Sequence, residues 1–311
     1  MTERDIQVAL LALLRAKGLN WHFIAREAQR PQGLERLLDG RCTEGSTEAN
    51  ESMTVLARHL HELDGHREQV AAMLEDTDAA GIGLTTVLDD TYPVNLRMIF
   101  NLPPFLFYRG ELREDDARAV AVVGTRAPTG MGLRRAAEMA RRLTEQNVTV
   151  LSGLAKGVDT AAHRATLDAG GRTIAVLGSG IMRIYPAENR ELAEEIVGNG
   201  ALVSQFWPDA PPAKYAFPRR NITMSGMGQG TVVIEASATS GAKMQARFAL
   251  EHGKRVWLLR SLVQEHSWAR TYATERGAKE VESVEEIVKE LRSPAAVKER
   301  ADARLQLSLA V

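Results

Sequence analysis

The sequence predicts an α/β protein whose doubly wound, mostly parallel sheet follows a small N-terminal helical domain. One observation is the stretch Ala119–Gly132, in which five small or β-branched apolar residues run into a glycine-rich turn and then a helical pattern. Such a run suits a strand buried on both faces of a parallel sheet, and the glycines allow a tight turn at a helix start. The other is the regular alternation of strand and helix patterns that follows, which is typical of this fold class.

The composition is that of an ordinary globular protein, with 44% hydrophobic and 25% charged residues in a chain of 311. Because the formal net charge is −1, any nucleic-acid site must be local rather than part of a general basic field. The single cysteine, Cys42, excludes an internal disulfide and a cysteine-based zinc site, and it fits a reducing cytoplasm. No stretch approaches the roughly 20 apolar residues of a membrane-spanning helix. We therefore expect a cytoplasmic protein without membrane contact, metal or cofactor.

Residues 1–80 are expected to form the helical domain, because apolar residues recur there at helical spacing in three short segments. A polar loop is expected over residues 43–51 and one longer amphipathic helix over residues 52–76. Core packing explains every apolar position, and docking on DNA or on a protein partner is the alternative. The three segments and the residues that terminate them are 6–14 with Gly18, 21–28 with Pro31, and 34–38 with Gly40.

Residues 83–110 combine β-branched and aromatic residues with three prolines, which favours short strands and turns over helix. The acidic run Glu111–Asp116 is a candidate seam before the main sheet. We expect the α/β domain to span residues 81–292. Residues 293–311 are first charged and then alternate apolar and polar side chains, which fits either a C-terminal tail or an oligomer contact.

From Ala119 onward, strand and helix patterns alternate, which implies parallel neighbours joined by crossover helices. After the first strand, further strands are predicted at 148–151, 173–177, 201–203, 231–234 and 255–259. Helices are predicted at 133–142, 158–169, 189–197, 219–227, 242–252 and 284–291.

In a parallel sheet, the residues that follow each strand meet at one edge, where ligands bind. Here these residues are small, offer free N–H groups and include three cations, which is the chemistry that a phosphate or a phosphodiester backbone requires. The alternative is that glycine merely terminates each strand. The candidate residues are Gly124, Thr125 and Arg126; Ser152, Gly153 and Lys156; Gly178, Ser179 and Gly180; and Ser240, Gly241 and Lys243.

Asp159 and His163 lie four residues apart, on one face of a predicted helix near its start. They have the types for an acid–base or metal pair, but neither an HExxH pattern nor a third ligand accompanies them. We expect a structural role, in which Asp159 charges or caps the helix start and orients His163.

The segment Tyr215–Asn221 reads YAFPRRN and contains two arginines, an amide and two aromatic rings. Arginine forks bind phosphates and rings stack on bases, so this set suits single-stranded nucleic acid. An ordinary solvated surface is the alternative. The candidate side chains are Phe217, Arg219, Arg220 and Asn221.

At these residues the sequence resembles the DprA/Smf family of DNA-processing proteins. The resemblance covers roughly residues 83–279 and rests on several motifs that occur in order along the chain. The motifs are AVVGTRAPTGMG, VLSGLAKGVDTAAHRATLDAGGRTIAVLGSGIMRIYPAENREL, FPRRN and VVIEASATSGAKMQARFAL.

The resemblance implies an extended Rossmann-like domain that binds single-stranded DNA without catalysis. It also implies a homodimer that hands the strand to a RecA-type recombinase during transformation; DprA-like proteins also occur in phage defence. By position, Gly124–Arg126 match the family's phosphate-contacting turn, Lys156 lies in the second turn, and Phe217–Asn221 match the FPxRN loop. The chain departs from the family pattern at Gln205, Ile222 and Gln245.

Three other functions stay open at this point. Residues 226–236 faintly resemble the GGxGTxxE signature of LOG-type nucleotide phosphoribohydrolases, although Glu235 stands one residue later than that signature requires. Because strand side chains alternate between faces, this shift turns the carboxylate away from the catalytic position. Another is an antitoxin-like regulator that binds a partner through its N-terminal helices. A nucleotide-binding sensor of the same fold also stays open, whereas a dinucleotide cofactor is disfavoured because Arg126 stands where a dinucleotide-binding loop has small residues.

Overall fold

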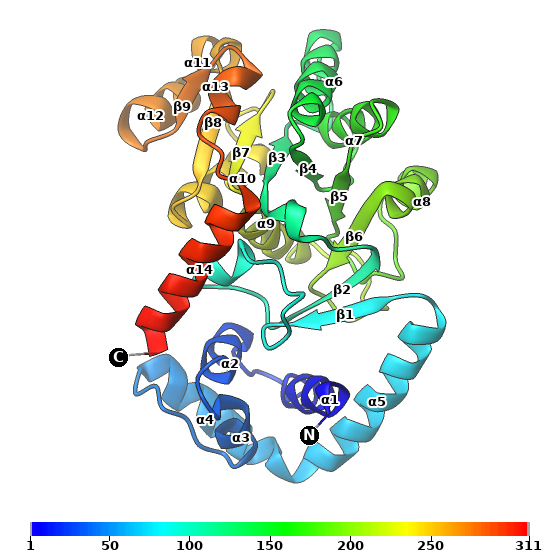
Figure 1. Cartoon of the computed structure of the whole chain (residues 1–311), viewed down its shortest axis with the longest axis vertical. Helices are drawn as coiled ribbons and strands as arrows, with labels where there is room; N and C mark the ends of the chain where they lie inside the picture. The colour runs from blue at the N-terminus through cyan, green and yellow to red at the C-terminus, as the bar shows by residue number, and fades with distance from the viewer. Residues whose placement is uncertain (1, 310–311) are drawn as a thin grey trace.

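In the computed structural model of the chain, which describes residues 2–309, a helical bundle packs against one edge of a nine-stranded mixed sheet (Figure 1). The strand order is β1-β2-β6-β5-β4-β3-β7-β8-β9. The strands are β1 (Gly83–Thr86), β2 (Phe105–Gly110), β3 (Ala119–Val123), β4 (Thr149–Ser152), β5 (Thr173–Val176), β6 (Gly200–Ser204), β7 (Gly230–Val233), β8 (Arg255–Leu259) and β9 (Lys279–Val281).

Strands β3 to β9 are parallel to their neighbours, and β1 and β2 add an antiparallel edge beside β6. The chain runs from β3 through β4 and β5 to β6 on one side, and then returns to pair β7 with the other side of β3. The point where the strand order reverses therefore lies between β3 and β7. This confirms the predicted doubly wound, mostly parallel, Rossmann-like sheet.

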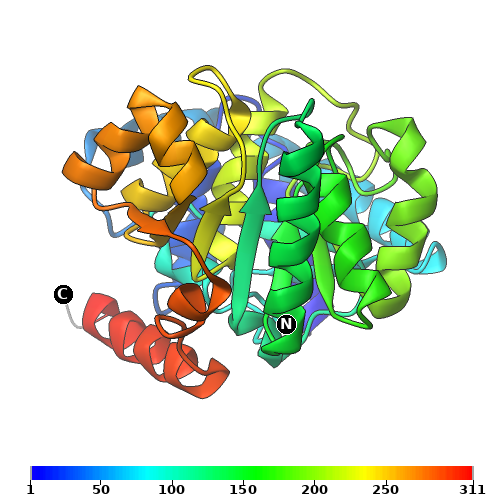
Figure 2. The same ribbon diagram turned by 90° about the horizontal axis from the view of Figure 1, so that it is seen from above.

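Helices cover both faces of the sheet, as the alternating side chains of β3 require: Val120 and Val122 belong to one apolar layer, and Ala121 and Val123 to the other. The first layer contains side chains from α6 (Gly130–Glu145), α7 (Val158–Asp168) and α13 (Val284–Val288). The second contains side chains from α9 (Ala216–Met227) and α10 (Gly241–Glu251). Figure 2 shows α6 in front of the sheet and the arrowheads of the parallel strands at one common edge.

The N-terminal helices share a continuous apolar core with this second layer. Trp21 packs against Phe105 of β2 at 5.3 Å between ring centroids, and Gln7 donates a buried hydrogen bond to Asp89. The two regions are thus joined by packing rather than by a flexible linker. The helices of the bundle are α1 (Glu3–Leu13), α2 (Trp21–Ala28), α3 (Gly33–Leu38), α4 (Thr47–His59) and α5 (Leu63–Ala79).

The bundle differs from the prediction in two places. Helix α4 begins inside the expected loop of residues 43–51, because the Ser46 hydroxyl caps it by accepting a hydrogen bond from Ala49 N at 3.1 Å. The single helix expected over residues 52–76 is divided into α4 and α5 by the 3₁₀ turn η1 (Leu60–Glu62).

The C-terminal half also contains elements that were not predicted. Residues 293–311, expected to be a tail, contain helix α14 (Pro294–Leu309), which buries Val297 and Ala301 one helical turn apart. Its Arg304 Nη1 donates to Met98 O at 2.8 Å. Helices α11 (Arg260–Glu265) and α12 (Ser267–Glu275) were not predicted either, whereas α8 (Arg190–Asn199) corresponds to the helix predicted at 189–197. The chain also contains the 3₁₀ turns η2 (Leu96–Met98), η3 (Glu114–Ala117) and η4 (Ala187–Asn189).

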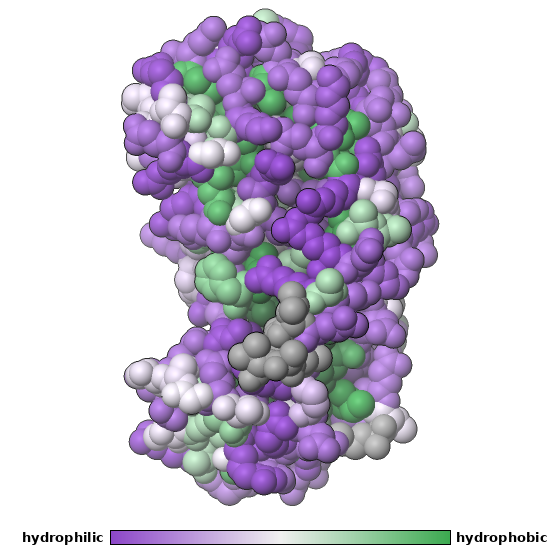
Figure 3. Space-filling model, turned by 60° about the vertical axis from the view of Figure 1, so that its left-hand side comes forward, coloured by the Kyte–Doolittle hydropathy of each residue, from purple (hydrophilic) through white to green (hydrophobic). Residues whose placement is uncertain are grey.

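No helix within residues 2–309 has the length and apolar character needed to cross a bilayer. On the face that Figure 3 shows, hydrophilic residues predominate and apolar ones form small, separate patches.

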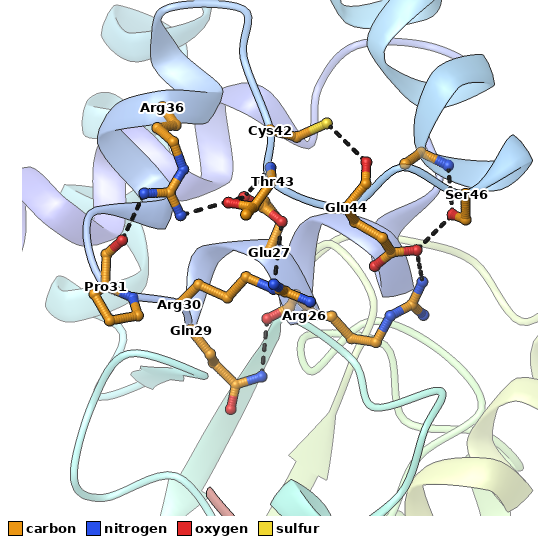
Figure 4. A network of polar contacts seen from close by, with 12 residues as sticks. Arg26, Glu27, Gln29, Arg30, Pro31, Arg36, Cys42, Thr43, Glu44 and Ser46 are labelled. Atoms are coloured by element: carbon orange, nitrogen blue, oxygen red, sulfur yellow. Dashed lines mark hydrogen bonds and ion pairs between the residues drawn. The ribbon is translucent and has the colours of Figure 1, made fainter. Parts of the chain in front are cut away.

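A buried carboxylate organises the polar interior of the bundle (Figure 4). The side chain of Glu27 is fully buried, and its Oε1 accepts from Thr43 N at 2.8 Å and from the Thr43 hydroxyl at 2.9 Å. Arg36 donates to the same oxygen at 3.3 Å, and Arg30 lies 3.6 Å from Oε2. Glu27 therefore ties the loop that contains Thr43 to both α2 and α3.

We expect Glu27→Ala to lower the free energy of unfolding by about 3 kcal/mol, because it leaves the Thr43 N–H and the Arg36 guanidinium without their buried acceptor. Urea unfolding followed by circular dichroism measures the loss. The control is Glu138→Ala on α6, where an exposed carboxylate pairs with Arg141; this change should cost at most about 1 kcal/mol. Equal losses in the two variants would contradict the role assigned to Glu27.

Candidate nucleic-acid interface

The loop after β3 carries Arg126 at the carboxyl edge of the sheet. Thr125 N donates to Glu235 O at 2.7 Å, which ties the start of this loop to the end of β7. The loop also lies directly on Gly157, where an added Cβ would come within 2.6 Å of Thr125 O and 2.8 Å of Arg126 O. Gly157 has a φ of +78° as well, so both the space and the backbone conformation require glycine there.

Asp159 binds the backbone of the turn that follows β4. Its buried carboxylate accepts from Gly153 N at 3.1 Å and from Ala155 N at 3.3 Å. Burial raises the pKa of Asp159, while the nearby Arg220 guanidinium and these two N–H donors act in the opposite direction. Asp159 thus fixes the backbone of the turn from which Lys156 projects.

Arg220 connects the ends of β4 and β5. It is 6% exposed, and its Nη1 donates to Gly153 O at 2.5 Å and to Val176 O at 3.0 Å. A Cβ at position 153 would lie 1.6 Å from this nitrogen, so the glycine makes room for the guanidinium. Burial lowers the pKa of Arg220, and Asp159 opposes that effect.

These turns surround a cavity of about 130 Å³. One wall is aromatic: the Phe217 ring lies 5.9 Å from the Tyr185 ring, and the Arg126 guanidinium lies over Phe217 at 5.3 Å. Gly178 permits this wall, because a Cβ there would come within 2.7 Å of the Phe217 ring. The lining residues are Arg126, Gly153, Ala155, Lys156, Gly178, Tyr185, Pro186, Phe217 and Arg220.

Six of the predicted site residues therefore meet around one cavity, but Arg220 is not the solvent-facing phosphate fork that its sequence context predicts. Its Nη1 is engaged by backbone carbonyls and its Nε by Asn221 Oδ1. Arg219 is the exposed member of the pair, with its guanidinium 5.5 Å from the Tyr215 ring. The helical start of α9 causes this division, because consecutive residues of a helix point in different directions.

The polar groups of several other predicted residues form hydrogen bonds within the protein and are therefore not free to bind a ligand. The Ser152 hydroxyl donates to Val122 O at 2.7 Å and is fully buried, and the buried Ser179 hydroxyl is bound to Arg183 O. Asn221 is also buried, and its Nδ2 lies 3.4 Å from Gly241 O. Gly180 packs against the carbonyls of residues 207 and 208. These side chains shape the site rather than face it.

The two predicted lysines, Lys156 and Lys243, lie in different parts of the structure. Lys156 reaches the cavity but is paired with Glu188 at 2.5 Å. Lys243 is absent from the cavity lining and lies 5.8 Å from the Trp268 ring, on the β7 side of the sheet. Ser240 caps α10 by accepting from Ala242 N at 3.1 Å, and Gly241 is the first residue of that helix. The candidate residues therefore meet around a site centred on β3, β4 and β5, and those after β7 lie apart from it.

Sequence reasoning missed Tyr185 and Pro186, which form part of the cavity wall. Tyr185 is 46% exposed and lies beside the Phe217 ring. The signal was present in the YPAEN stretch, where an aromatic residue and a proline follow the Gly178–Gly180 turn within the same loop.

His163 is not oriented by Asp159, contrary to the sequence prediction. Its Nδ1 lies 2.7 Å from the Thr173 hydroxyl, which itself donates to Val150 O at 2.8 Å. Nδ1 must therefore carry the proton, and Nε2 is buried with no partner among the described residues. Although both residues lie on one helix face, the Asp159 carboxylate turns back toward the preceding loop.

Burial, with a smaller contribution from Arg220, lowers the pKa of His163 to about 3. The unfolded chain takes up this proton near pH 6.5, so stability is fully present above that pH and is lost as the pH falls toward 3. Between these limits the loss is about 1.4 kcal/mol per pH unit. Urea unfolding at pH 6 and at pH 5 should show a slope that is steeper in the wild type than in His163→Gln by about 1.4 kcal/mol per pH unit. His22 and His252, whose pKa values burial also lowers, contribute to the slope of both proteins. Equal slopes in the two would contradict a buried neutral imidazole at position 163.

Glu235 occupies the place where a dinucleotide-binding sheet holds its pyrophosphate, at the helix start beside the point of strand-order reversal. Its carboxylate accepts from Thr129 N at 3.1 and 3.3 Å and from the Thr129 hydroxyl at 2.8 Å. The N–H of Thr129, the N-cap residue of α6, is therefore directed toward a side chain of the same protein, while the cavity lies on the opposite side, toward β4 and β5.

Residues 83–292 match the family described as DNA recombination-mediator protein A. The chain belongs to this family. It is 37% identical to the DNA processing protein DprA of Streptococcus pneumoniae over 206 residues, and this match covers 66% of this chain and 73% of that protein. With DprA of Bacillus subtilis the identity is 33% over 213 residues, covering 68% and 72%. These relatives confirm the DprA/Smf resemblance.

Solved DprA structures have the same fold. The crystal structure of S. pneumoniae DprA superposes with a TM-score of 0.74 at 29% identity, over 90% of this chain and 96% of that one. A Helicobacter pylori DprA structure, described in terms of its single-stranded DNA binding mode, superposes with a TM-score of 0.59 at 23% identity, over 67% and 94%. The likeness to S. pneumoniae DprA extends beyond the family match and includes N-terminal helices of this chain.

Proposed function

We propose that this DprA-family chain binds single-stranded DNA over the cavity bounded by Arg126, Tyr185 and Phe217, and that it does so without catalysis. The observation that carries the proposal is the aromatic wall with a guanidinium above it. A ring stacks on a nucleobase of any sequence, and an adjacent arginine pairs with the phosphate that follows. Gly153 and Gly178 make room for the Arg220 guanidinium and the Phe217 ring, which line the cavity.

A single strand fits this arrangement better than a duplex. The Phe217 and Tyr185 rings offer faces for stacking, and a base in a duplex is already stacked and paired, so it would have to be flipped out first. The DprA of H. pylori is described as binding single-stranded DNA, and membership of the same family makes this the expected ligand class here.

The absence of catalysis is part of the proposal. The hydrolase alternative needs a free Glu235 carboxylate, and here that carboxylate is bound to Thr129. We expect no base to be released from nucleoside monophosphates on prolonged incubation. Release of base that Glu235→Gln abolishes would overturn this part of the proposal.

The proposal extends to a homodimer that transfers the strand to a RecA-type recombinase, in transformation or in phage defence. Light scattering at increasing concentration tests the first point, and co-elution with a purified recombinase in the presence of DNA tests the second. A monomer at all concentrations would remove the homodimer from the proposal, and failure to co-elute would remove the transfer step. Neither result would affect the DNA site itself.

Titration of fluorescent oligonucleotides at two salt concentrations tests the proposed ligand. We expect tighter binding of single-stranded than of double-stranded DNA, with an affinity that falls steeply with salt, by about 0.7 in log–log slope for each phosphate contacted. Equal affinity for the two forms would contradict a stacking site.

A further inference from the structure

We propose that Glu235 is a positioning residue that clamps the Arg126 loop for DNA, and that it strengthens binding although its charge opposes that of the ligand. The inference rests on the proposed DNA site and goes beyond it, because it assigns a role to an acidic residue outside the cavity lining. Both ends of one short loop are bound to Glu235.

The clamp consists of two sets of hydrogen bonds to one residue, Glu235: one to its backbone and one to its side chain. At the start of the loop, Thr125 N donates to the backbone oxygen of Glu235 at 2.7 Å. At its end, the N–H of Thr129 donates to Oε1 at 3.1 Å, and its hydroxyl donates to Oε2 at 2.8 Å. Arg126 lies between these two attachment points. A short segment held at both ends has few alternative conformations, so its exposed arginine is directed toward the Phe217 ring.

The surrounding residues are shaped to keep the carboxylate in place. The Thr129 hydroxyl also accepts from Gly132 N at 2.9 Å, which links the clamp to the first turn of α6. A Cβ at position 132 would lie 2.1 Å from Glu235 Oε2 and displace the carboxylate. At position 130, in the same helical turn, the nearest atom to an added Cβ is Arg134 Nη1 at 3.8 Å. The chain thus has a glycine that the clamp requires and a neighbouring one that it does not.

A simple charge argument makes the opposite prediction. Removing a carboxylate near a polyanion should strengthen binding, and moving it slightly should have little effect. The clamp predicts that Glu235→Ala and Gly132→Ala both weaken binding, although the second keeps the charge. Glu235→Gln retains an oxygen that accepts from Thr129, so we expect it to bind close to the wild type.

Two measurements on the full chain test the clamp. The first needs no DNA: trypsin cleaves after Arg126, and loosening the loop should speed that cleavage by about fivefold for each hydrogen bond lost. The second is the affinity for a fluorescent single-stranded oligonucleotide, which we expect to fall about tenfold in Glu235→Ala and Gly132→Ala if Arg126 loses its phosphate contact. Gly130→Ala should match the wild type in both.

The clamp acts through Arg126, so the two affinity losses should vanish in an Arg126→Ala background. Equal losses in that background, wild-type or tighter binding by Glu235→Ala, or a Glu235→Gln as weak as the alanine variant would overturn the inference. If the wild type binds no single-stranded DNA, the proposed function fails, and trypsin cleavage still decides whether the loop is clamped. Unchanged cleavage in both clamp variants would overturn the clamp by itself.

Discussion

Arg126→Ala is expected to weaken binding of single-stranded DNA by at least about tenfold, because an arginine–phosphate hydrogen bond contributes about 1.5–3 kcal/mol. Arg126 is exposed and lies over Phe217. No hydrogen bond or ion pair of its side chain competes with a ligand among the contacts in residues 2–309. Titrations at two salt concentrations should also show a log–log slope that is smaller by about 0.7, equivalent to one lost phosphate contact.

Arg134→Ala is the matched control for Arg126→Ala. Arg134 is another exposed arginine, on α6 and outside the cavity lining, so its loss changes the net charge equally. We expect it to change the affinity only slightly. Equal losses in the two variants would mean that binding depends on the overall charge and not on this site.

Arg220→Met is expected to lower the free energy of unfolding by about 3 kcal/mol, because it leaves two buried backbone carbonyls without a donor. These are Gly153 O and Val176 O, at the ends of β4 and β5. The change also removes the cation nearest the buried Asp159 carboxylate, which makes ionisation of that group less favourable. Urea unfolding measures the stability, and the DNA titration should show weaker binding because the turn after β4 loses its support.

The neighbouring residue supplies the control for Arg220. Arg219 is exposed, and its guanidinium contacts the Tyr215 ring. We expect Arg219→Met to leave the free energy of unfolding within about 0.5 kcal/mol of the wild type and to weaken DNA binding. If Arg219→Met were the more destabilising of the two, the division of roles between these arginines would be wrong.

Much of the fold could be predicted from the sequence because the parallel strands are buried and apolar on both faces. Strand β3 is an example: all five residues are buried, and the glycine that follows it marks the turn. Helix α14 could not be predicted in the same way, since only Val297 and Ala301 are buried and the rest of its pattern resembles a charged tail. The short edge strand β9 is set by pairing with β8 rather than by its own residues.

The types of residue at the candidate site could be predicted from the sequence, but the different role of each residue could not. The two arginines of FPRRN are equivalent in sequence, and only the direction of α9 makes one exposed and the other buried. Glu235 belongs to the faint hydrolase signature of the sequence, and its contact with Thr129 depends on how the end of β7 and the start of α6 meet in the fold. Tyr185 lies far from Phe217 in the sequence, and their contact required the folded chain.

Photocross-linking of a 5-iodouracil-substituted single strand, followed by mass spectrometry, tests the proposed DNA site most directly. Stacking on the aromatic wall predicts cross-links to Tyr185 or Phe217, which Phe217→Ala should reduce, and none to the α6 start, where Glu235 fills the donor position. Cross-links confined to residues outside the cavity lining, unaffected by Phe217→Ala, would contradict the proposal that this cavity receives the strand.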